Sequence, residues 1–308
     1  MIRRLVDMAA FARLPFHSVG VLPFVLGTAI AWRQTGIFRW DVFALAVIAV
    51  MLIMLATYAA GERWDVEEDT RSQMRPVRSR FAGGSGTVVR GDISQKTAFA
   101  VSVMSLILAA TIGTVLQFVY RTGPWTLPLG AVGILGGFFY STPPLRWVSR
   151  GFGELWIGLC YGWLPVAVAA YLQTGTFLPW VHIVAVPIGL SIFNVILLNE
   201  FPDYEADRAS GKRNLLVRVG PQTAVGIYTA VSVAVMVAAS LSVVLGWRPG
   251  VLLGIAPVLV LATGVTGGVL AGRWRDPRRL ERLCAGNLIV NLGTTAAFLV
   301  LFLVEVPR

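Results

Sequence analysis

Two short acidic clusters stand out in a sequence that is otherwise poor in charge. Only 14% of the 308 residues are charged and 56% are hydrophobic, whereas soluble domains average about 25% charged residues. Nine of the 16 acidic residues nevertheless fall within two windows of eight residues, and each window follows a long apolar stretch. These nine residues are Glu62, Asp65, Glu67, Glu68, Asp69, Glu200, Asp203, Glu205 and Asp207.

The spacing within each window predicts one stripe of oxygen ligands on a helix face. The first stripe follows the spacing i, i+3, i+7 and the second follows i, i+4, i+8. Their members are Glu62, Asp65 and Asp69 in the first stripe, and Asn199, Asp203 and Asp207 in the second. Pro202 predicts a kink in the second stripe, because proline removes a backbone hydrogen bond. Stacked carboxylates repel one another, and a hard cation such as Mg²⁺, which prefers oxygen ligands and substrate phosphates, would reverse that repulsion.

Basic residues and glycines accompany the acids. Arginine and lysine are the usual anchors of phosphate oxygens, and the loop 80–94 contains four glycines, so its backbone can approach a ligand closely. Solvated loops at a membrane edge are the alternative interpretation of each cluster, but the paired arrangement favours a site that binds metal and diphosphate. The bases that follow the two clusters are Arg71, Arg75, Arg78, Arg80, Lys212 and Arg213.

The apolar stretches that carry these clusters have the length of membrane-spanning helices. A large soluble helical protein would show polar helix faces, and the stretch 231–245 has no charged residue. The sequence therefore predicts an all-α, polytopic membrane protein with nine transmembrane helices. These are expected near 16–32, 42–60, 98–120, 125–141, 152–173, 179–199, 223–247, 250–272 and 284–304.

The basic residues predict the orientation of the chain. If the N-terminus is cytoplasmic, 21 of the 26 bases lie on the cytoplasmic side, as the positive-inside rule expects. The acidic clusters are then cytoplasmic, the odd helix number places the C-terminus outside, and the membrane is the cell inner or plasma membrane. The net charge of +10 indicates topology and contact with membrane lipid. Nucleic acid is not an expected partner, because the bases are divided among short loops.

Several segments resemble the UbiA-type intramembrane prenyltransferases. Asp65-x-x-x-Asp69 resembles the first aspartate motif of that family, and Asn199-x-x-x-Asp203-x-x-x-Asp207 resembles the second. Nine helices and the stretch "YSTPPLRWVSRGFGEL" (140–155) also match the family pattern. Within the family, "DYEADRASGKRNLLVRVG" (203–220) and "FAGGSGTVVRGDIS" (81–94) are most similar to the 1,4-dihydroxy-2-naphthoate polyprenyltransferase, or menaquinone, branch. One departure is Gly61-Glu62, where the family usually has Asn-Asp.

The resemblance implies Mg²⁺-dependent transfer of a polyprenyl chain from its diphosphate to an aromatic acceptor. That acceptor would be 1,4-dihydroxy-2-naphthoate or a related quinone precursor. Two ions are implied, one bound by Asp65 and Asp69 with Glu62 keeping an acid on the stripe, and one by Asn199, Asp203 and Asp207. Tyr140 would lie near the reacting carbon as a catalytic residue beside the four aspartates. The candidates for the diphosphate are Arg78, Arg80, Arg146, Lys212 and Arg213, and those for the acceptor are Tyr140, Ser141 and Asn194.

Other polar residues inside the apolar segments have competing interpretations. An acid such as Glu154 near the start of a spanning helix is energetically costly unless it is paired or faces a cavity. A salt bridge to Arg150 and a role in the site are therefore both possible interpretations of Glu154. Interhelical hydrogen bonds are the expected use of Asn287, Asn291 and Asn194, with acceptor binding as the other use considered for Asn194.

Two other functions remain open, together with the domain organisation. One is prenyl transfer to a non-aromatic lipid or sugar acceptor, and the other, from a different class, is a secondary transporter or ion carrier. The repeated pattern of an apolar helix followed by an acid stripe predicts a single domain, 1–308. Its two similar halves would cover about 1–142 and 143–308.

Overall fold

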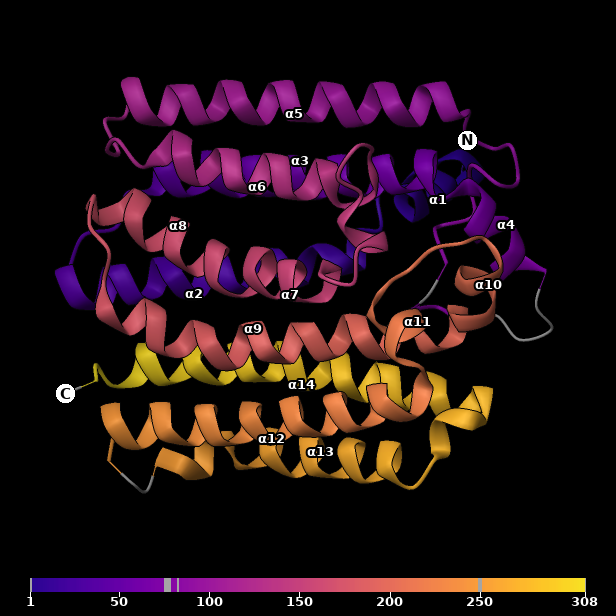
Figure 1. Cartoon of the computed structure of the whole chain (residues 1–308). Helices are drawn as coiled ribbons and strands as arrows, with labels where there is room; N and C mark the ends of the chain where they lie inside the picture. The colour runs from indigo at the N-terminus through magenta and orange to yellow at the C-terminus, as the bar shows by residue number, and fades with distance from the viewer. Residues whose placement is uncertain (1, 75–78, 82, 249–250, 308) are drawn as a thin grey trace.

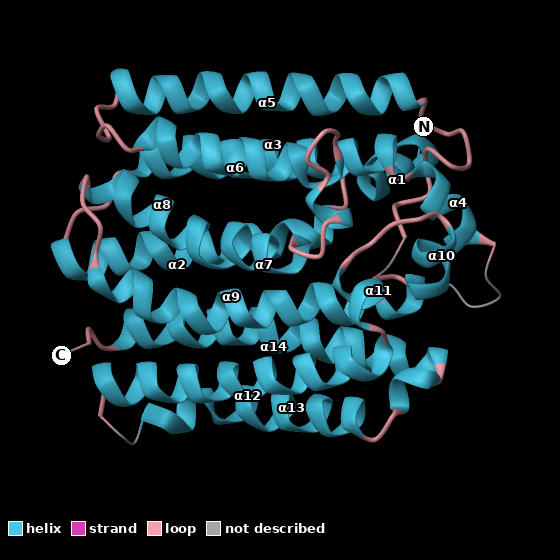
Figure 2. Cartoon of the chain, viewed as in Figure 1, coloured by secondary structure: helices cyan, strands magenta, loops and turns pink. Residues whose placement is uncertain are grey.

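The chain folds into a bundle of long helices that lie side by side. A computed structural model describes residues 2–74, 79–81, 83–248 and 251–307. Every regular element in these ranges is helical and none is a strand (Figure 2). The predicted all-α membrane bundle is therefore confirmed. Its long helices are α2 (Ser18–Thr35), α3 (Trp40–Trp64), α5 (Gln95–Phe118), α6 (Thr126–Ser141), α8 (Leu164–Thr174), α9 (Pro179–Asn199), α12 (Pro221–Gly246), α13 (Leu252–Leu270) and α14 (Pro277–Val304).

The membrane-spanning segments agree with the predicted ones except for one short helix. Eight helical segments of the described chain are long and apolar enough to cross a membrane. One of them combines α7 (Gly153–Gly158), a π-helical turn (Leu159–Trp163) and α8. The ninth expected segment, 125–141, forms α6, which has only 16 residues. At about 1.5 Å per residue it extends about 24 Å, less than the roughly 30 Å of a hydrocarbon core.

The short helices gather at one end of the bundle. Figure 1 shows them at the end where α3 and α9 finish, whereas α14 finishes at the opposite end, so the two chain ends lie apart. The four short helices are α1 (Ile2–Phe11), α4 (Val66–Gln73), α10 (Tyr204–Ala209) and α11 (Leu215–Val219). Both acidic clusters therefore lie at the same end of the bundle.

Each acidic cluster lies where a long helix is interrupted. Helix α3 ends at Trp64, but the backbone N–H of Asp65 still donates to Gly61 O (2.8 Å) and that of Asp69 to Asp65 O (2.9 Å). The helical spacing of the first stripe thus continues into α4. After α9, Pro202 lies in a 3₁₀ turn, and Asp203 N donates to Glu200 O (3.0 Å), three residues back. The interruption predicted at Pro202 is present.

Polar side chains inside the bundle connect its C-terminal helices. The amide of Asn194 donates to Tyr228 O (3.0 Å) and Ser232 Oγ (2.9 Å), which joins α9 to α12. Asn287 Oδ1 on α14 accepts from the Tyr228 hydroxyl (3.1 Å), and Asn291 Nδ2 donates to Ser191 Oγ on α9 (2.7 Å). The interhelical role predicted for Asn287 and Asn291 is confirmed.

Close approach of α2 and α8 depends on a glycine. A Cβ at Gly27 would collide with the carbonyl oxygen of Val166 and would lie 2.9 Å from the Cβ of Ala169. Small residues permit such contact between membrane helices. Helix α2 also packs against α14. Through its contacts with α8 and α14, α2 joins the N-terminal and C-terminal parts of the bundle.

We expect Gly27→Ala to destabilise the protein by about 1–3 kcal/mol, the usual cost of overpacking a dense interior. Thermal unfolding in detergent, followed by tryptophan fluorescence, measures the change. Gly264→Ala on α13 is the matched control, because a Cβ there meets no atom within 4 Å. Equal unfolding temperatures for the two variants would contradict this view of the α2–α8 contact.

Candidate functional site

A cavity of about 220 Å³ lies at the end of the bundle where the acids gather. It brings together both predicted stripes, the first ending at Asp69 and the second beginning only at Asn199. Asn199, Tyr140 and Ser141 also line it. The charged residues of its lining are Arg13, Glu62, Asp65, Glu68, Asp69, Glu200, Asp203, Asp207 and Lys212.

Arg146 and Ser141 hold the first acidic cluster. Asp65 accepts a hydrogen bond from the Ser141 hydroxyl (2.7 Å) and another from Arg146 Nη2 (3.0 Å). The same Arg146 nitrogen donates to Glu68 Oε1 at 2.6 Å. Arg146, a candidate for the diphosphate, therefore forms ion pairs with two carboxylates of this cluster.

Lys212 and Asn214 hold the second acidic cluster. The Lys212 ammonium lies 3.5 Å from Asp207 Oδ1, and Asn214 Nδ2 donates to Asp207 Oδ2 at 2.8 Å. Burial disfavours the charged ammonium, but the carboxylates of Asp207 and Asp65 outweigh it and raise the pKa of Lys212 above its ordinary value. Lys212 thus carries a positive charge in the cavity, as a residue expected to bind diphosphate must.

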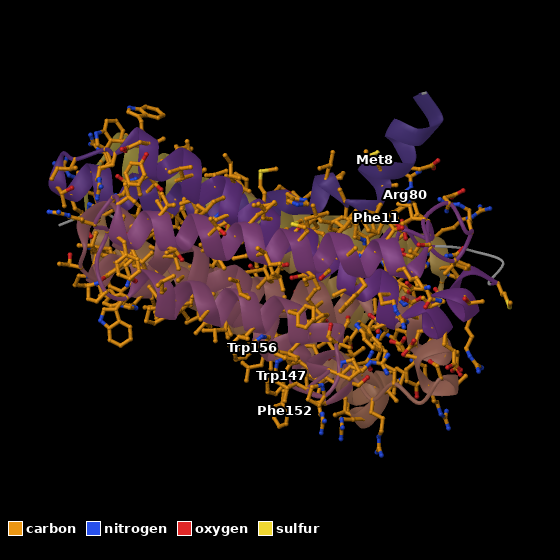
Figure 3. The ribbon with its side chains drawn as sticks, turned by 90° about the horizontal axis from the view of Figure 1, so that it is seen from above. Met8, Phe11, Arg80, Trp147, Phe152 and Trp156 are labelled. Atoms are coloured by element: carbon orange, nitrogen blue, oxygen red, sulfur yellow. The ribbon has the colours of Figure 1, made fainter. Side chains whose placement is uncertain are left out.

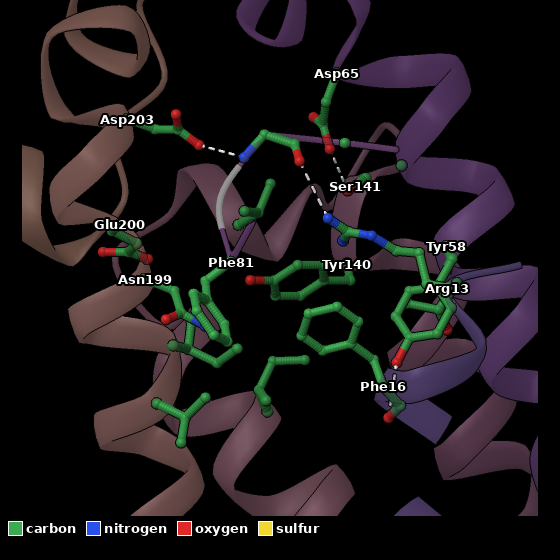
Figure 4. Close-up of a pocket in the computed structure, with 18 of the residues that line it drawn as sticks. Arg13, Phe16, Tyr58, Asp65, Phe81, Tyr140, Ser141, Asn199, Glu200 and Asp203 are labelled. Atoms are coloured by element: carbon green, nitrogen blue, oxygen red, sulfur yellow. Dashed lines mark hydrogen bonds between the residues drawn. The ribbon is translucent and has the colours of Figure 1, made fainter. Parts of the chain in front are cut away.

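The glycine-rich loop contacts both clusters through consecutive backbone N–H groups. Gly83 N donates to Asp203 Oδ2 (2.6 Å), Gly84 N to Asp69 Oδ1 (2.7 Å), and Ser85 N to Glu62 Oε1. Figure 4 shows the first of these bonds. A Cβ at Gly84 would collide with Asp69 Oδ2, so this approach requires glycine.

The environment of Asp69 is unfavourable for its negative charge. Burial raises its pKa to about 7, and nearby Asp65 and Glu62 add to the rise, although the hydrogen bond from Gly84 opposes it. Burial and like charges are the conditions under which a bound cation would be most favourable.

The donor set fits a hard metal ion. Asn199 Oδ1 and Glu62 Oε2 are buried and have no hydrogen-bond partner among the residues that the structure describes, and both residues line the cavity. Such oxygens are costly unless a ligand or water satisfies them. No three Asp, Glu, His or Cys side chains of the described chain converge as ready-made metal ligands, and loop N–H groups occupy several of the carboxylate oxygens.

An aromatic wall adjoins the acidic part of the cavity. Tyr140, Phe16, Tyr58 and Phe81 line it, and Figure 4 shows Arg13 among these rings. Arg13 Nη2 donates to Gly83 O at 3.1 Å. Sequence reasoning missed Arg13 and Phe16, because they belong to the turn before α2 and reach the site only through tertiary folding.

A second cavity, of about 300 Å³, continues from the first into the bundle. The two cavities share Thr57, Ile157 and Tyr161. Its lining is almost entirely apolar and comes from α2, α3, α5, α6 and the α7–α8 segment. The acidic cavity therefore borders a space suited to a hydrocarbon chain.

Several predicted site residues lie elsewhere. Arg80 and Arg213 are exposed and outside the lining, and Figure 3 shows Arg80 beside Met8 and Phe11 of α1. Asn194 lies in the interhelical cluster described above rather than in the cavity lining. Arg78 lies outside the described residues.

Glu154 has a structural contact in place of the salt bridge considered for it. Its Oε1 accepts from Leu215 N (2.9 Å), while Arg150 donates to Pro144 O and Leu145 O (both 2.9 Å). Glu200 Oε2 accepts from the neighbouring Leu216 N at 3.4 Å. The two glutamates thus hold the start of α11, directly after the segment that carries Lys212.

Curated relatives share between a quarter and a third of the aligned residues with this chain. A 2-carboxy-1,4-naphthoquinone phytyltransferase of Synechocystis sp. is 29% identical over 70% of this chain and 66% of its own length. A 1,4-dihydroxy-2-naphthoate octaprenyltransferase of Bacillus subtilis is 26% identical over 69% of this chain and 66% of its own length. The enzyme of the same name from Escherichia coli is 27% identical over 87% of each chain.

Solved structures share the fold. A digeranylgeranylglyceryl phosphate synthase superposes with a TM-score of 0.69 at 16% identity, covering 98% of this chain and all of that one. A UbiA homologue of Archaeoglobus fulgidus bound to GPP and Mg²⁺ gives a TM-score of 0.65 at 14% identity, covering 95% and 99%.

The family model for UbiA prenyltransferases matches residues 21–301, which include both acidic stripes and all but the first residues of α2 and the last residues of α14 among the long helices. The chain belongs to the UbiA prenyltransferase family.

Proposed function

We propose that the protein transfers a polyprenyl group from polyprenyl diphosphate to an aromatic acceptor in a Mg²⁺-dependent reaction. The observation that carries this proposal is the cavity in which two acid stripes and Lys212 meet beside an apolar cavity. The relatives named above act on naphthoate or naphthoquinone acceptors by their names, which supports 1,4-dihydroxy-2-naphthoate or a related quinone precursor. We propose the cell inner or plasma membrane as its location, with the site on the cytoplasmic side.

The oxygen ligands proposed for Mg²⁺ come from both stripes. Asp65, Asp69 and Glu62 would bind one ion, and Asn199, Asp203 and Asp207 a second. Two ions suit six oxygen-bearing side chains divided between two stripes, because Mg²⁺ takes few protein ligands and keeps positions for water and phosphate. Bound there, Mg²⁺ would offset the negative charge that grows on the departing diphosphate.

The protein's own side chains account for the remaining chemistry. Lys212 donates to the diphosphate while the bond between the allylic carbon and oxygen breaks and the oxygen keeps the electron pair. The ring face of Tyr140 shelters the allylic cation, and an electron-rich ring carbon of the acceptor forms the new C–C bond and loses its proton. The buried, aromatic surroundings exclude water, which would otherwise capture the cation.

The apolar cavity is the proposed site of the prenyl chain. It begins beside Tyr161 and Ile157, where the two cavities meet, and several glycines of α6 form one of its walls. At Gly133 a Cβ would make ordinary contact with Leu164 (3.6 Å) and Ile53 (3.7 Å), so a longer side chain there would project into the cavity.

The two alternative functions, a transporter and an enzyme with a non-aromatic acceptor, receive less support from the structure. The acid stripes lie at one end of α3 and α9 (Figure 1), whereas transporter sites usually lie near the middle of the membrane. A non-aromatic acceptor receives no support from the aromatic wall, where planar rings can stack. The enzyme with an aromatic acceptor is therefore the function that the geometry supports best.

Removal of one carboxylate from either stripe should reduce transfer strongly. We expect Asp65→Asn and Asp203→Asn each to lower kcat at least about 100-fold, since each removes charge stabilisation from the developing diphosphate. The rate is measured with purified protein, labelled prenyl diphosphate, Mg²⁺ and 1,4-dihydroxy-2-naphthoate. Glu67→Gln is the matched control, because Glu67 is exposed on α4 and pairs with Arg71. Retained activity in the two aspartate variants, or in the presence of a chelator, would refute the proposal.

Filling the apolar cavity should restrict the enzyme to donors with shorter prenyl chains. We expect Gly133→Leu to raise KM about tenfold or more for long polyprenyl diphosphates, with little effect on geranyl diphosphate. The lost space displaces several methylene groups, each contributing about 0.8 kcal/mol when buried. Gly226→Leu on the exposed face of α12 is the control. An unchanged chain-length profile in Gly133→Leu would argue against this cavity as the prenyl site.

The contact between the loop and the carboxylates should weaken in Gly84→Ala. Its Cβ would collide with Asp69 Oδ2, so residues 83–85 should exchange amide hydrogen faster than in the wild type, by about tenfold or more. Mg²⁺ should have a similar effect on the wild type, because it competes for the same oxygens. Ser85→Ala keeps its N–H bond to Glu62 and should retain protection. Equal protection of this loop in all three proteins, with and without Mg²⁺, would contradict the competition.

A further inference from the structure

Arg13 is a cation of the cavity lining that is not matched by any carboxylate. The lining contains two basic side chains of the described chain, Arg13 and Lys212. Lys212 pairs with Asp207, whereas Arg13 forms no salt bridge with a described residue, and its hydrogen-bond partner is the carbonyl of Gly83. A guanidinium has five N–H donors, so most of its capacity remains for a ligand.

The backbone holds Arg13 in this position at an energetic cost. Arg13 connects α1 to the turn Leu14–His17 in a left-handed conformation, with φ 50° and ψ 42°. For a residue other than glycine this conformation is energetically unfavourable, and such strain persists only where the surrounding contacts enforce it. Here Phe16 N donates to Arg13 O (2.8 Å), and the side chain enters the cavity beside Tyr58 (Figure 4).

Aromatic rings surround the Arg13 guanidinium. Its Cζ lies 5.4 Å from the ring centre of Phe16 and 5.8 Å from that of Tyr58. Tyr140 and Phe81 line the same part of the cavity (Figure 4). A fork of N–H donors set among aromatic faces is the chemistry that recognises a planar aromatic acid, whose ring stacks while its carboxylate takes two parallel hydrogen bonds.

Gly83 lies between Arg13 and Asp203 of the second acid stripe. It presents its N–H to Asp203 and its carbonyl to Arg13 (Figure 4). A diphosphate held by Lys212 and metal ions belongs with the acids. The guanidinium of Arg13, which forms no salt bridge with a described acid, is left for the other substrate.

A groove leads from Arg13 to the surface. Arg13, Phe16, Gly83 and Gly84 line both the cavity and an open groove of about 450 Å³, whose rim carries the exposed Arg80. Its other walls come from the end of α1 and from Ser79 and Ser85. With Arg13 and Arg80 in its lining, this groove suits a water-soluble anion, whereas the apolar cavity deeper in the bundle suits the prenyl chain.

We propose that Arg13 binds the carboxylate of the acceptor and thereby selects aromatic acids over neutral aromatic rings. This inference rests on the proposed prenyl transfer, because it assigns the second substrate of that reaction to a place in the site. Arg13 acts as a specificity-determining residue, and the groove between α1 and the glycine-rich loop is the path by which the acid reaches it.

Binding without donor or metal tests the assignment directly. In the presence of a chelator, 1-hydroxy-2-naphthoate should bind the wild type at least about tenfold more tightly than 1-hydroxy-2-naphthamide, since a charged hydrogen bond contributes about 1.5–3 kcal/mol. Arg13→Gln should lose this preference and Arg13→Lys should keep part of it. Arg63→Gln, which removes a cation from the ring of Trp64 outside the cavity, should retain it. Equal binding of acid and amide by the wild type would overturn the proposal.

Kinetics separate the two anions that Arg13 could bind. With labelled prenyl diphosphate, Arg13→Gln should raise KM for 1,4-dihydroxy-2-naphthoate about 10- to 100-fold. KM for the donor and for neutral 1,4-dihydroxynaphthalene should stay unchanged. A raised donor KM with unchanged acceptor preference would overturn the proposal by assigning Arg13 to the diphosphate.

The same variants keep the test informative if a protein misfolds or if transfer is absent. Should Arg13→Gln fail to fold, Arg13→Lys must show a weaker preference for the acid, and a full preference would refute the assignment. If no acceptor is prenylated, the proposed function fails, while the binding measurement still decides whether Arg13 recognises an aromatic carboxylate.

Discussion

The repulsion between carboxylates at one end of an apolar bundle is the constraint on which the surrounding structure depends. Like charges on neighbouring helical turns already repel in water, and the repulsion grows where burial lowers the local dielectric. Three kinds of donor offset it: the Arg146 guanidinium at Asp65 and Glu68, the Lys212 ammonium at Asp207, and the N–H groups of the glycine-rich loop. Each donor comes from a different connection between helices, so the acids tie these connections to one end of the bundle.

The loop N–H groups occupy the oxygens that a metal ion would use. Gly83 and Gly84 are adjacent in the chain, yet they donate to Asp203 of one stripe and Asp69 of the other. A short stretch of backbone therefore bridges the two stripes as a cation would, with partial positive charge. A cation bound at these oxygens would replace the hydrogen bonds, so its binding would be linked to the position of the loop. The position of Arg13 is coupled to the same loop, because its hydrogen-bond partner is the carbonyl of Gly83.

The sequence predicts the parts of this protein that depend on local patterns. The apolar stretches gave the spanning helices, and helical spacing indicated that Asp65, Asp69, Asp203 and Asp207 could share a site, which the structure brings into one cavity. Contacts that depend on tertiary folding were not predictable. Nearness in sequence suggested Arg213 as a phosphate ligand, but it is exposed, while Arg13 reaches the cavity from far along the chain through an unusual backbone conformation. The segment 125–141 was predicted with nearly the bounds of α6, but it was counted as a spanning helix although 16 residues are short for a bilayer.

Gly61 illustrates how a missing side chain can itself serve the site. A Cβ there would lie 3.6 Å from Asp65 Oδ2 and 3.7 Å from Ser141 Oγ, both ordinary contacts, so packing does not require glycine as it does at Gly84. Glycine inside a helix costs roughly 0.5–1 kcal/mol relative to alanine, and Asp65 already has hydrogen bonds from Ser141 and Arg146. What the glycine leaves is open space beside Asp65 in the cavity lining. The cost in helix stability is thus matched by room for substrate at the point where the first acidic stripe meets the aromatic wall.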